Sequence, residues 1–201
     1  MWDERYSSTD FVYGEAPNEF LRDNVERLPV GRTLCLAEGE GRNAVFLAAA
    51  GHDVLAVDQS SVGLEKARRL AASRGVEIRT EVADLAIFDP GEAVWDAVVS
   101  ISAHLPSIIR RDLHRRVARA LRPSGVLILE AYTLAQHGTA GTGGPPPGQE
   151  DMLMSLAALR EELADLEELH GVELVREVNE GAFHKGPGAV VQFIARRPAE
   201  G

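Results

Sequence analysis

The feature that most constrains the fold of this chain is an alternation of short apolar runs with segments of helical periodicity. This order is typical of a doubly wound α/β sheet, in which helices cover both faces of mostly parallel strands. Thr33–Ala37 and Val126–Tyr132 are almost entirely apolar, as strands buried on both faces must be. The five strands expected up to this point are Thr33–Ala37, Asp53–Val57, Val76–Val82, Trp95–Ile101 and Val126–Tyr132.

Helices are predicted between these strands and before the first one. Asn43–Ala50 has helical periodicity, and Ser60 is expected to cap a helix that stops at Gly75. Two further amphipathic helices are expected to begin at Pro17 and at Pro106, because proline suits the first turn of a helix.

The last third of the chain mixes a long loop with regular elements. Five glycines and three prolines make Gly138–Gly148 a loop, either a lid over a substrate or a mobile connection. Ser155 is expected to cap a helix that runs to about Leu166. A closing β-hairpin is predicted from Val172–Val178, Ala189–Ala195 and a long tip, Asn179–Gly188.

Composition narrows the classes of partner. The 201 residues are 45% apolar and 26% charged, which describes one globular domain. The longest apolar run has seven residues, Ala44–Ala50, where a bilayer span needs about 20, and Met1–Arg5 does not resemble a signal peptide. We therefore expect a cytoplasmic location and no membrane partner. A net charge of −10 disfavours nucleic acid and leaves a small molecule as the expected partner.

Basic and metal-binding side chains give no further site. The arginines after Pro106 are expected to form a solvated helix face, although an RNA-binding strip is an alternative. Cys35 lies in an apolar run and is expected to be buried and inert. We predict no metal site because four of the histidines show no metal-ligand spacing among them. The arginines are Arg110, Arg111, Arg115, Arg116, Arg119 and Arg122, and the histidines are His52, His114, His137 and His170.

The most informative segment is Glu38–Ala44, which follows an apolar strand and opens a helix. Its glycines, Gly39 and Gly41, allow a ligand to approach the backbone closely. Asp58 ends the second expected strand, 20 residues after Glu38, where a carboxylate accepts hydrogen bonds from both ribose hydroxyls. We therefore expect a ligand that contains adenosine, with a glycine-rich turn that binds nothing as the alternative.

Charge distinguishes the candidate cofactors. A pyrophosphate at a helix N-terminus needs a site without carboxylates, yet Glu38 and Glu40 place two in this loop. S-adenosylmethionine carries an ammonium and a sulfonium, so its charge matches. Ala83-Asp84-Leu85 follows the third strand, where the carboxylate and the next N–H are expected to bind adenine unless the tripeptide is only a helix cap.

These motifs resemble the class I S-adenosylmethionine-dependent methyltransferases, and specifically the small bacterial branch that includes the tellurite-resistance methyltransferases. The resemblance covers nearly the whole chain and implies a Rossmann-like, doubly wound seven-stranded sheet, mostly parallel, with the last strand antiparallel. One departure is Ser100-Ile-Ser-Ala-His104, which replaces the Asn-Pro-Pro-Tyr type of motif and disfavours amino groups of DNA or protein as acceptors. The supporting motifs are Gly41-Arg42-Asn43, Phe46–Val54, Tyr13-Gly14-x-x-Pro17-Asn18, Thr142–Pro145, Glu180-Gly-x-x-His184-Lys185 and Val191–Arg196.

The resemblance also implies roles for individual residues. Glu38 is expected near the methionine amino group, Asp58 at the ribose, and Asp84 with Leu85 at the adenine. The full set of expected cofactor-binding residues is Tyr13, Glu38, Gly39, Glu40, Gly41, Arg42, Asn43, Asp58, Gln59, Ser60, Ala83, Asp84, Leu85 and Ser100.

Three residues are candidates for catalysis. His104 follows the fourth strand and is expected to face the reacting methyl, with a purely structural histidine as the alternative. His184 and Lys185 lie on the predicted hairpin tip, where the tellurite branch has a His-Arg pair near its oxyanion. A solvated turn is the alternative for that pair.

The sequence thus predicts one methyltransferase domain over residues 1–201 that methylates a small nucleophile, whether a metalloid oxyanion, a thiol or a small metabolite. A nicotinamide-dependent reductase and a non-catalytic S-adenosylmethionine sensor are the alternatives. The expected parts are an N-terminal helical cap (1–30), a cofactor-binding core (31–132), the Gly/Pro-rich loop (133–154) and a helix with a C-terminal hairpin (155–201).

Overall fold

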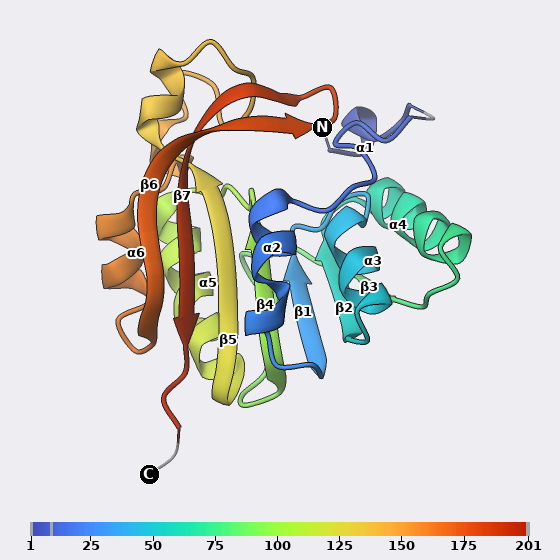
Figure 1. Cartoon of the computed structure of the whole chain (residues 1–201), viewed down its shortest axis with the longest axis vertical. Helices are drawn as coiled ribbons and strands as arrows, with labels where there is room; N and C mark the ends of the chain where they lie inside the picture. Colours follow the sequence, from blue (N-terminus) through green and yellow to red (C-terminus); the bar gives the residue numbers. More distant parts are fainter. Residues whose placement is uncertain (1, 9, 200–201) are drawn as a thin grey trace.

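A seven-stranded sheet forms the centre of the computed structural model, which describes residues 2–8 and 10–199 (Figure 1). Its strands are β1 (Arg32–Leu36), β2 (Asp53–Asp58), β3 (Arg79–Val82), β4 (Trp95–Ile101), β5 (Leu121–Tyr132), β6 (Glu167–Glu180) and β7 (His184–Arg196). They are ordered β3-β2-β1-β4-β5-β7-β6; β1 to β5 are parallel and β7 is antiparallel to both of its neighbours. The predicted fold class is confirmed.

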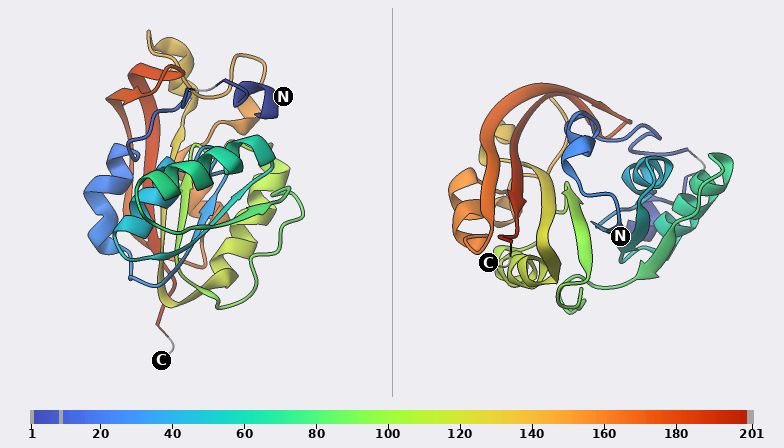
Figure 2. Two further views of the ribbon diagram at one scale, coloured as in Figure 1. Left: turned by 90° about the vertical axis from the view of Figure 1, so that its right-hand side faces the viewer. Right: turned by 60° about the horizontal axis from the view of Figure 1, so that its bottom comes forward.

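Helices cover both faces of the sheet, as the two views of Figure 2 show. Helices α2, α3 and α4 pack on one face, and α5 and α6 pack on the other. The helices are α1 (Trp2–Arg5), α2 (Glu19–Asn24), α3 (Arg42–Ala49), α4 (Ser61–Ser73), α5 (Ser107–Ala120), α6 (Leu156–Glu162) and the short 3-10 turns η1 (Val25–Arg27), η2 (Leu134–Gly138) and η3 (Glu150–Met152).

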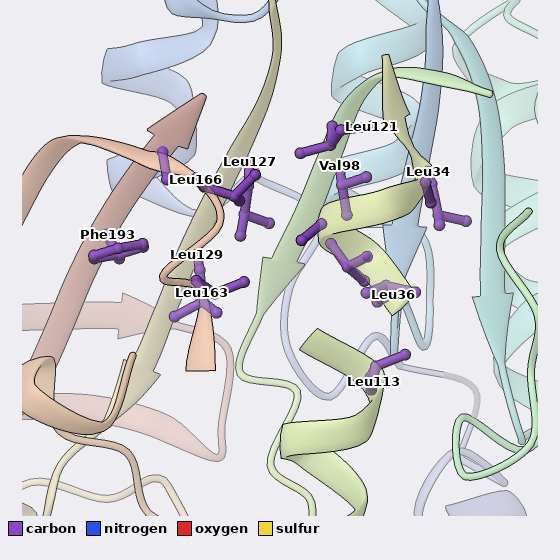
Figure 3. Packing of buried hydrophobic residues seen from close by; sticks show 14 of the residues in the cluster. Leu34, Leu36, Val98, Leu113, Leu121, Leu127, Leu129, Leu163, Leu166 and Phe193 are labelled. Atoms are coloured by element: carbon purple, nitrogen blue, oxygen red, sulfur yellow. The ribbon is translucent and has the colours of Figure 1, made fainter. Parts of the chain in front are cut away.

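The core is divided by the sheet because successive strand residues point to opposite faces. Leu127 and Leu129 of β5 pack with Leu113 of α5 (Figure 3), whereas Ile128 packs on the other face with Leu47 of α3. All five side chains are at most 2% exposed. Full burial of each stabilises the fold by about 1.5–3 kcal/mol, so the apolar runs fix the strands and the covering helices together.

The C-terminal hairpin has a shorter turn than the sequence predicted. Pairing of β6 with β7 continues to Glu180 and His184, so most of the expected long tip, Asn179–Gly188, is strand. The prediction of a long tip is wrong. The glycines and Pro187 of this segment suggested a loop, but most of the segment pairs as strand. The pairing of β7 with β5 begins at Val190, after Pro187. Pro187 therefore does not interrupt the hydrogen bonds between these two strands.

The helix capped by Ser155 ends at Glu162, not near Leu166, and β6 begins at Glu167 instead of Val172. The starts of β3 and β5 also differ from the prediction. β3 begins at Arg79 instead of Val76, since the Val76 N–H donates to the Ala71 carbonyl and completes the end of α4. β5 begins at Leu121, which pairs with Trp95 before a bulge. In both places hydrogen bonds to neighbouring elements, which sequence periodicity does not record, decide where the strand starts.

The predicted solvated face of α5 is wrong for Arg110, which is 4% exposed. Its Nη2 lies 2.8 Å from Glu162 Oε1 of α6, and its Nη1 donates to the carbonyls of Asp151 and Leu153. The prediction considered this helix alone and did not include α6, which packs over this side of α5. Arg110 therefore anchors the end of the Gly/Pro-rich loop beneath the carboxyl ends of the strands.

Candidate functional site

The predicted cofactor residues gather at the carboxyl ends of the parallel strands, the upper edge of the sheet in Figure 1. Glu38 follows β1, Asp58 ends β2, Asp84 follows β3, and His104 follows β4. The chain order of the strands reverses between β1 and β4, and ligands of open α/β sheets bind at such a switch point. Strand topology thus brings together residues that are far apart in the sequence.

Glu38 occupies the N-terminus of α3. Its Oε1 accepts hydrogen bonds from the backbone N–H groups of Asn43 (2.9 Å) and Ala44 (2.7 Å). Burial raises the pKa of this carboxyl to about 7, against the opposing effects of these bonds and of the Arg42 charge. The protein's own carboxylate therefore fills the position where a dinucleotide pyrophosphate would bind, which disfavours the reductase alternative.

Asp58 is held in place by the backbone of two loops. Its Oδ2 accepts from the Gly39 N–H at 2.9 Å and its Oδ1 accepts from the Ser60 N–H at 2.8 Å. Burial raises the pKa of this carboxyl. Each oxygen keeps a further lone pair, so the oriented carboxylate can also accept from two vicinal hydroxyls.

Gly39 and Gly41 have the positive φ angles, 58° and 88°, that glycine adopts without strain. At Gly41 a Cβ would lie 2.5 Å from Cβ of Ala67, so the loop packs closely on α4. At Gly39 a Cβ would lie 2.5 Å from the Tyr6 hydroxyl oxygen. Both glycines therefore permit a close approach to the backbone of the loop, and in this structure Tyr6 and Ala67 make that approach. A close approach by a ligand stays a prediction.

The sequence analysis missed the N-terminal segment, residues 2–8, as part of the site. Tyr6 lies over Gly39, and burial together with the nearby Asp58 charge raises its pKa. Asp3 Oδ1 accepts from the Ser60 hydroxyl at 2.5 Å, while the Ser60 hydroxyl caps α4 through the Gly63 N–H at 3.0 Å. The available signal was the i, i+4 aromatic pair Trp2 and Tyr6, whose rings stack at 5.9 Å.

Three residues predicted at the cofactor direct their side chains to other protein groups. Glu40 forms a buried ion pair with Lys66 at 2.5 Å and accepts from the Tyr13 N–H at 3.3 Å. Arg42 pairs with Glu180, and Asn43 accepts from the Asn18 N–H at 2.9 Å. These contacts join the loop to α4, to β6 and to the segment before α2.

The remaining cofactor candidates differ in exposure. Leu85 and Ser100 are buried, whereas Gln59 and Asp84 are exposed. Asp84 accepts from the Ala86 N–H at 2.9 Å, which is the geometry of a local turn. The second carboxylate oxygen of Asp84 takes no part in that turn. Ala83-Asp84-Leu85 can therefore form the turn and still present a hydrogen-bond acceptor at the edge of the sheet.

His104 is held by backbone on both sides of its ring. Nδ1 lies 3.1 Å from the Met152 carbonyl oxygen, and Nε2 accepts from the Tyr132 N–H at 3.3 Å. Burial lowers its pKa to about 4, so the ring is neutral at neutral pH. Because both nitrogens have partners, the geometry favours the structural alternative over a base that faces the methyl.

His184 has the opposite character. It is 8% exposed, its ring centroid lies 4.7 Å from that of Tyr13 and 5.3 Å from that of Tyr132, and its Nδ1 has no hydrogen-bond partner among the described residues. Burial first, and then the Arg42 charge, lower its pKa to about 3. We name Tyr13, His104, Tyr132 and His184 the aromatic cluster. The Nδ1 atom of His184 is thus a buried polar atom whose hydrogen-bonding capacity the described residues do not use.

Lys185 does not share this environment. Successive residues of a strand alternate in direction, and Lys185 is exposed whereas His184 is buried. Its backbone forms an isolated bridge with Thr142, which fastens the Gly/Pro-rich loop to β7. Next to this bridge, Gly143 and Gly144 lie against the Tyr132 ring. The loop therefore covers the aromatic cluster.

No group of three or more metal-ligating side chains is found within residues 2–8 and 10–199. In the same part of the chain, no helix has the length and apolarity that crossing a membrane requires.

Sequence comparisons relate part of this chain to known proteins. Residues 34–125 match the family model of the methyltransferase domain. Hemagglutinin 1 of Eikenella corrodens is 32% identical over 124 residues, which are 58% of this chain and 40% of that protein. The uncharacterized methyltransferase YbaJ of Bacillus subtilis (strain 168) is 32% identical over 100 residues, 48% of this chain and 38% of that protein. The chain thus spans about two-fifths of the length of these relatives.

Solved structures share the fold over almost the whole chain. TehB from Haemophilus influenzae has a TM-score of 0.73 and 17% identity, covering 98% of this chain and 65% of TehB. The structure described as "Conversion of a Disulfide Bond into a Thioacetal Group during Echinomycin Biosynthesis" has a TM-score of 0.76 and 21% identity, covering 98% and 88%. At these identities the likeness concerns the fold.

Residues 34–125 thus match a methyltransferase domain, the class of enzyme that the motifs predicted. The cofactor of this class is S-adenosylmethionine. The residues present fit it: Glu38, a buried carboxylate held by backbone N–H groups, suits an ammonium, and the oriented Asp58 suits a ribose.

Replacing Asp58 with alanine is expected to weaken binding of S-adenosylhomocysteine by at least about tenfold. Each hydrogen bond to a carboxylate contributes about 1.5–3 kcal/mol, and 1.4 kcal/mol corresponds to a factor of ten. Calorimetric titration measures the affinity. Asp53→Ala is the matched control, since it removes an exposed carboxylate from the other end of β2. Equal affinities for the two variants would remove the ribose assignment.

Proposed function

We propose that this protein transfers a methyl group from S-adenosylmethionine to a small nucleophile that binds against the aromatic cluster. The observation that carries the proposal concerns two buried groups, the Glu38 carboxylate and the His184 Nδ1 atom, which has no hydrogen-bond partner among the described residues. The elements that carry these two groups are joined by the Arg42–Glu180 ion pair. Residues 31–132 would bind the cofactor, and residues 133–201 would supply the acceptor side.

Each end of the site has a separate task. Glu38 would hold the ammonium, Asp58 the ribose, and Asp84 with Leu85 the adenine. When bound, the sulfonium supplies an already activated methyl group, so the chain mainly has to align the acceptor and exclude water. Tyr6 lies over Gly39 at the cofactor end, and Gly143 and Gly144 lie against Tyr132 at the acceptor end. These contacts support the exclusion of water from the proposed site.

His184 would orient the nucleophile. Because its low pKa keeps it neutral, it does not attract an anion by charge, but Nδ1 can accept a hydrogen bond from a protonated nucleophile when the ring proton is on Nε2. This favours a thiol or a hydroxyl-bearing metabolite over a free oxyanion. Lys185 is not needed for this role, since its side chain is exposed.

Two experiments test the proposal in sequence. Thermal unfolding is expected to shift upward with S-adenosylhomocysteine and not with NADH, and the reverse result would support the reductase alternative. A screen with labelled methyl donor then compares a small thiol, tellurite and hydroxyl-bearing metabolites as acceptors. Binding without turnover of any acceptor would support the sensor alternative.

A further inference from the structure

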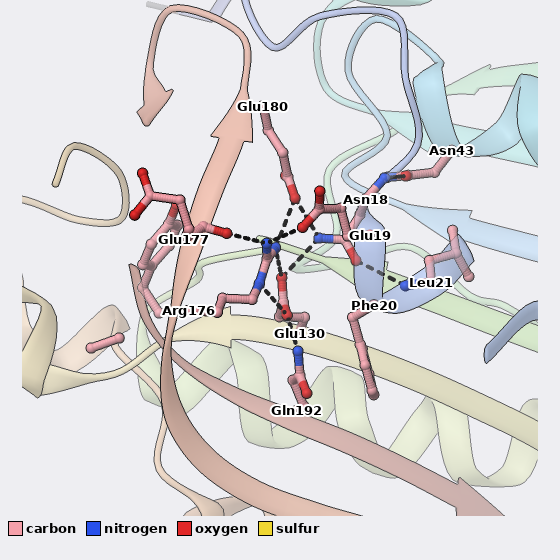
Figure 4. Close-up of polar contacts among 12 residues, drawn as sticks. Asn18, Glu19, Phe20, Leu21, Asn43, Glu130, Arg176, Glu177, Glu180 and Gln192 are labelled. Carbon is pink, nitrogen blue, oxygen red and sulfur yellow. Dashed lines mark hydrogen bonds and ion pairs between the residues drawn. The ribbon is translucent and has the colours of Figure 1, made fainter. Parts of the chain in front are cut away.

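A buried polar network joins the N-terminal region, α3, β5 and the hairpin behind the proposed site (Figure 4). Asn18 is fully buried, and its Nδ2 donates to Glu130 Oε1 at 2.8 Å and to Glu180 Oε1 at 2.9 Å. Arg176 pairs with the same two carboxylates at 2.6 and 2.7 Å. Several motif residues without a role in the proposed reaction therefore belong to one cluster.

Arg42 connects this network to the cofactor loop. It is the first residue of α3 and directly follows Gly41, but its Nη2 reaches Glu180 Oε2 at 2.5 Å, at the end of β6. The side chains of Arg42 and Glu180 are 8% and 5% exposed. In this environment an ion pair is maintained only with good geometry. Loss of Glu180 would remove the buried ion-pair partner of Arg42, whereas loss of Arg42 would leave Glu180 paired with Arg176 alone.

The position of this pair relates it to both ends of the proposed site. Arg42 immediately precedes Asn43 and Ala44, whose N–H groups hold the Glu38 carboxylate. Glu180 is the cross-strand partner of His184 at the last pair of the hairpin. One ion pair thus links the loop that carries Glu38 with the strand end that carries His184.

We propose that Arg42 is a positioning residue, which fixes the acceptor-side hairpin against the cofactor loop through its ion pair with Glu180. This inference rests on the proposed function and deepens it. It explains how the cofactor loop and the hairpin, which are far apart in the sequence, keep a fixed distance from each other. A displacement of about 1 Å between reacting groups can lower a rate by about 10².

The charge of Arg42 also acts on both halves. It lowers the pKa of Glu38, which Asp58 opposes, and it lowers the pKa of His184, which Glu180 opposes. His104 and Arg5 lower the pKa of His184 as well, and Tyr13 and Tyr132 face its ring. Removal of the Arg42 charge should therefore raise both pKa values.

The experiment compares Arg42→Gln, Arg42→Lys and Arg122→Gln. Arg122 pairs with Asp96 at 3.0 Å at the amino end of the sheet, so its loss removes an ion pair far from the site. S-adenosylmethionine affinity is measured against pH, and the His184 ring is titrated by NMR. In Arg42→Gln we expect both midpoints to move upward and turnover to fall about tenfold, whereas Arg42→Lys and Arg122→Gln keep the wild-type midpoints.

A folded Arg42→Gln protein with wild-type midpoints and wild-type turnover overturns the inference. If that variant does not fold, Glu180→Gln replaces it, since glutamine keeps the size of the side chain and one acceptor oxygen but removes the negative charge. Glu180→Gln is expected to lower turnover about tenfold with cofactor affinity within about a factor of two, and wild-type turnover overturns the inference. Failure of wild-type protein to bind S-adenosylmethionine contradicts the proposed function alone, because the His184 titration in Arg42→Gln needs no cofactor.

Discussion

Replacing His184 with alanine is expected to lower the methylation rate by about 10² or more while S-adenosylhomocysteine affinity stays within about a factor of two. This is the usual scale for loss of a proton acceptor or an orienting group. The separation is expected because His184 lies against the aromatic rings of Tyr13 and Tyr132, whereas we propose that Glu38 and Asp58 bind the cofactor. Single-turnover rates and calorimetric titration measure the two effects.

Three control variants separate chemistry from packing. Lys185→Ala removes the exposed neighbour on the same strand and should leave the rate within about a factor of two. His184→Phe keeps a ring between Tyr13 and Tyr132 but has no nitrogen, so it should be as slow as His184→Ala. His184→Asn returns an acceptor oxygen and should recover part of the rate. Wild-type turnover by His184→Phe would exclude any role for the imidazole nitrogen.

His184 also shows why the sequence alone did not predict the environment of a side chain. Glycines and a proline around it predicted a long hairpin tip, with a solvated turn as the alternative for His184, because local composition is all that a sequence displays for a turn. Burial of His184 comes from Tyr13 and Tyr132, which lie far away in the chain. The alternation along β7 that separates His184 from Lys185 follows only once the strand is known to extend that far.

The sheet was predictable because its strands are short apolar runs whose burial has few alternatives. Trp95–Ile101 was predicted with the observed bounds, and β1 and β2 differ by one residue at their ends. Once the parallel order is known, the position of Glu38 and Asp58 at one edge follows from topology. The acidic loop therefore gave the cofactor class without any knowledge of side-chain contacts.

Side-chain partners were not predictable in the same way. Arg110 looked solvated until α6 was seen to cover it, and Arg42 looked like a cofactor contact until Glu180 was seen to bind it. Asp3 and Tyr6 precede every recognisable motif, yet they lie against Ser60 and Gly39. Long-range pairing of polar groups depends on the assembled fold, and residue spacing carries no signal for it.

Replacing Glu38 with glutamine is expected to weaken S-adenosylmethionine binding by about 10- to 100-fold at pH 8 while adenosine affinity changes by less than about twofold. A hydrogen bond between an ammonium and a carboxylate contributes about 1.5–3 kcal/mol, and adenosine has no ammonium. Glutamine keeps an oxygen that can accept from the N–H groups of Asn43 and Ala44, so the start of α3 should persist.

The same residue predicts a pH dependence. Burial raises the pKa of Glu38 to about 7, so the wild-type carboxyl is mostly protonated at pH 6 and mostly ionised at pH 8. Because only the ionised form attracts the ammonium, wild-type affinity for S-adenosylmethionine should rise across this range. Glu38→Gln should show no such rise, and adenosine binding should show none with either protein. Titrations at pH 6, 7 and 8 that give parallel curves for wild type and Glu38→Gln would place the methionine ammonium away from Glu38.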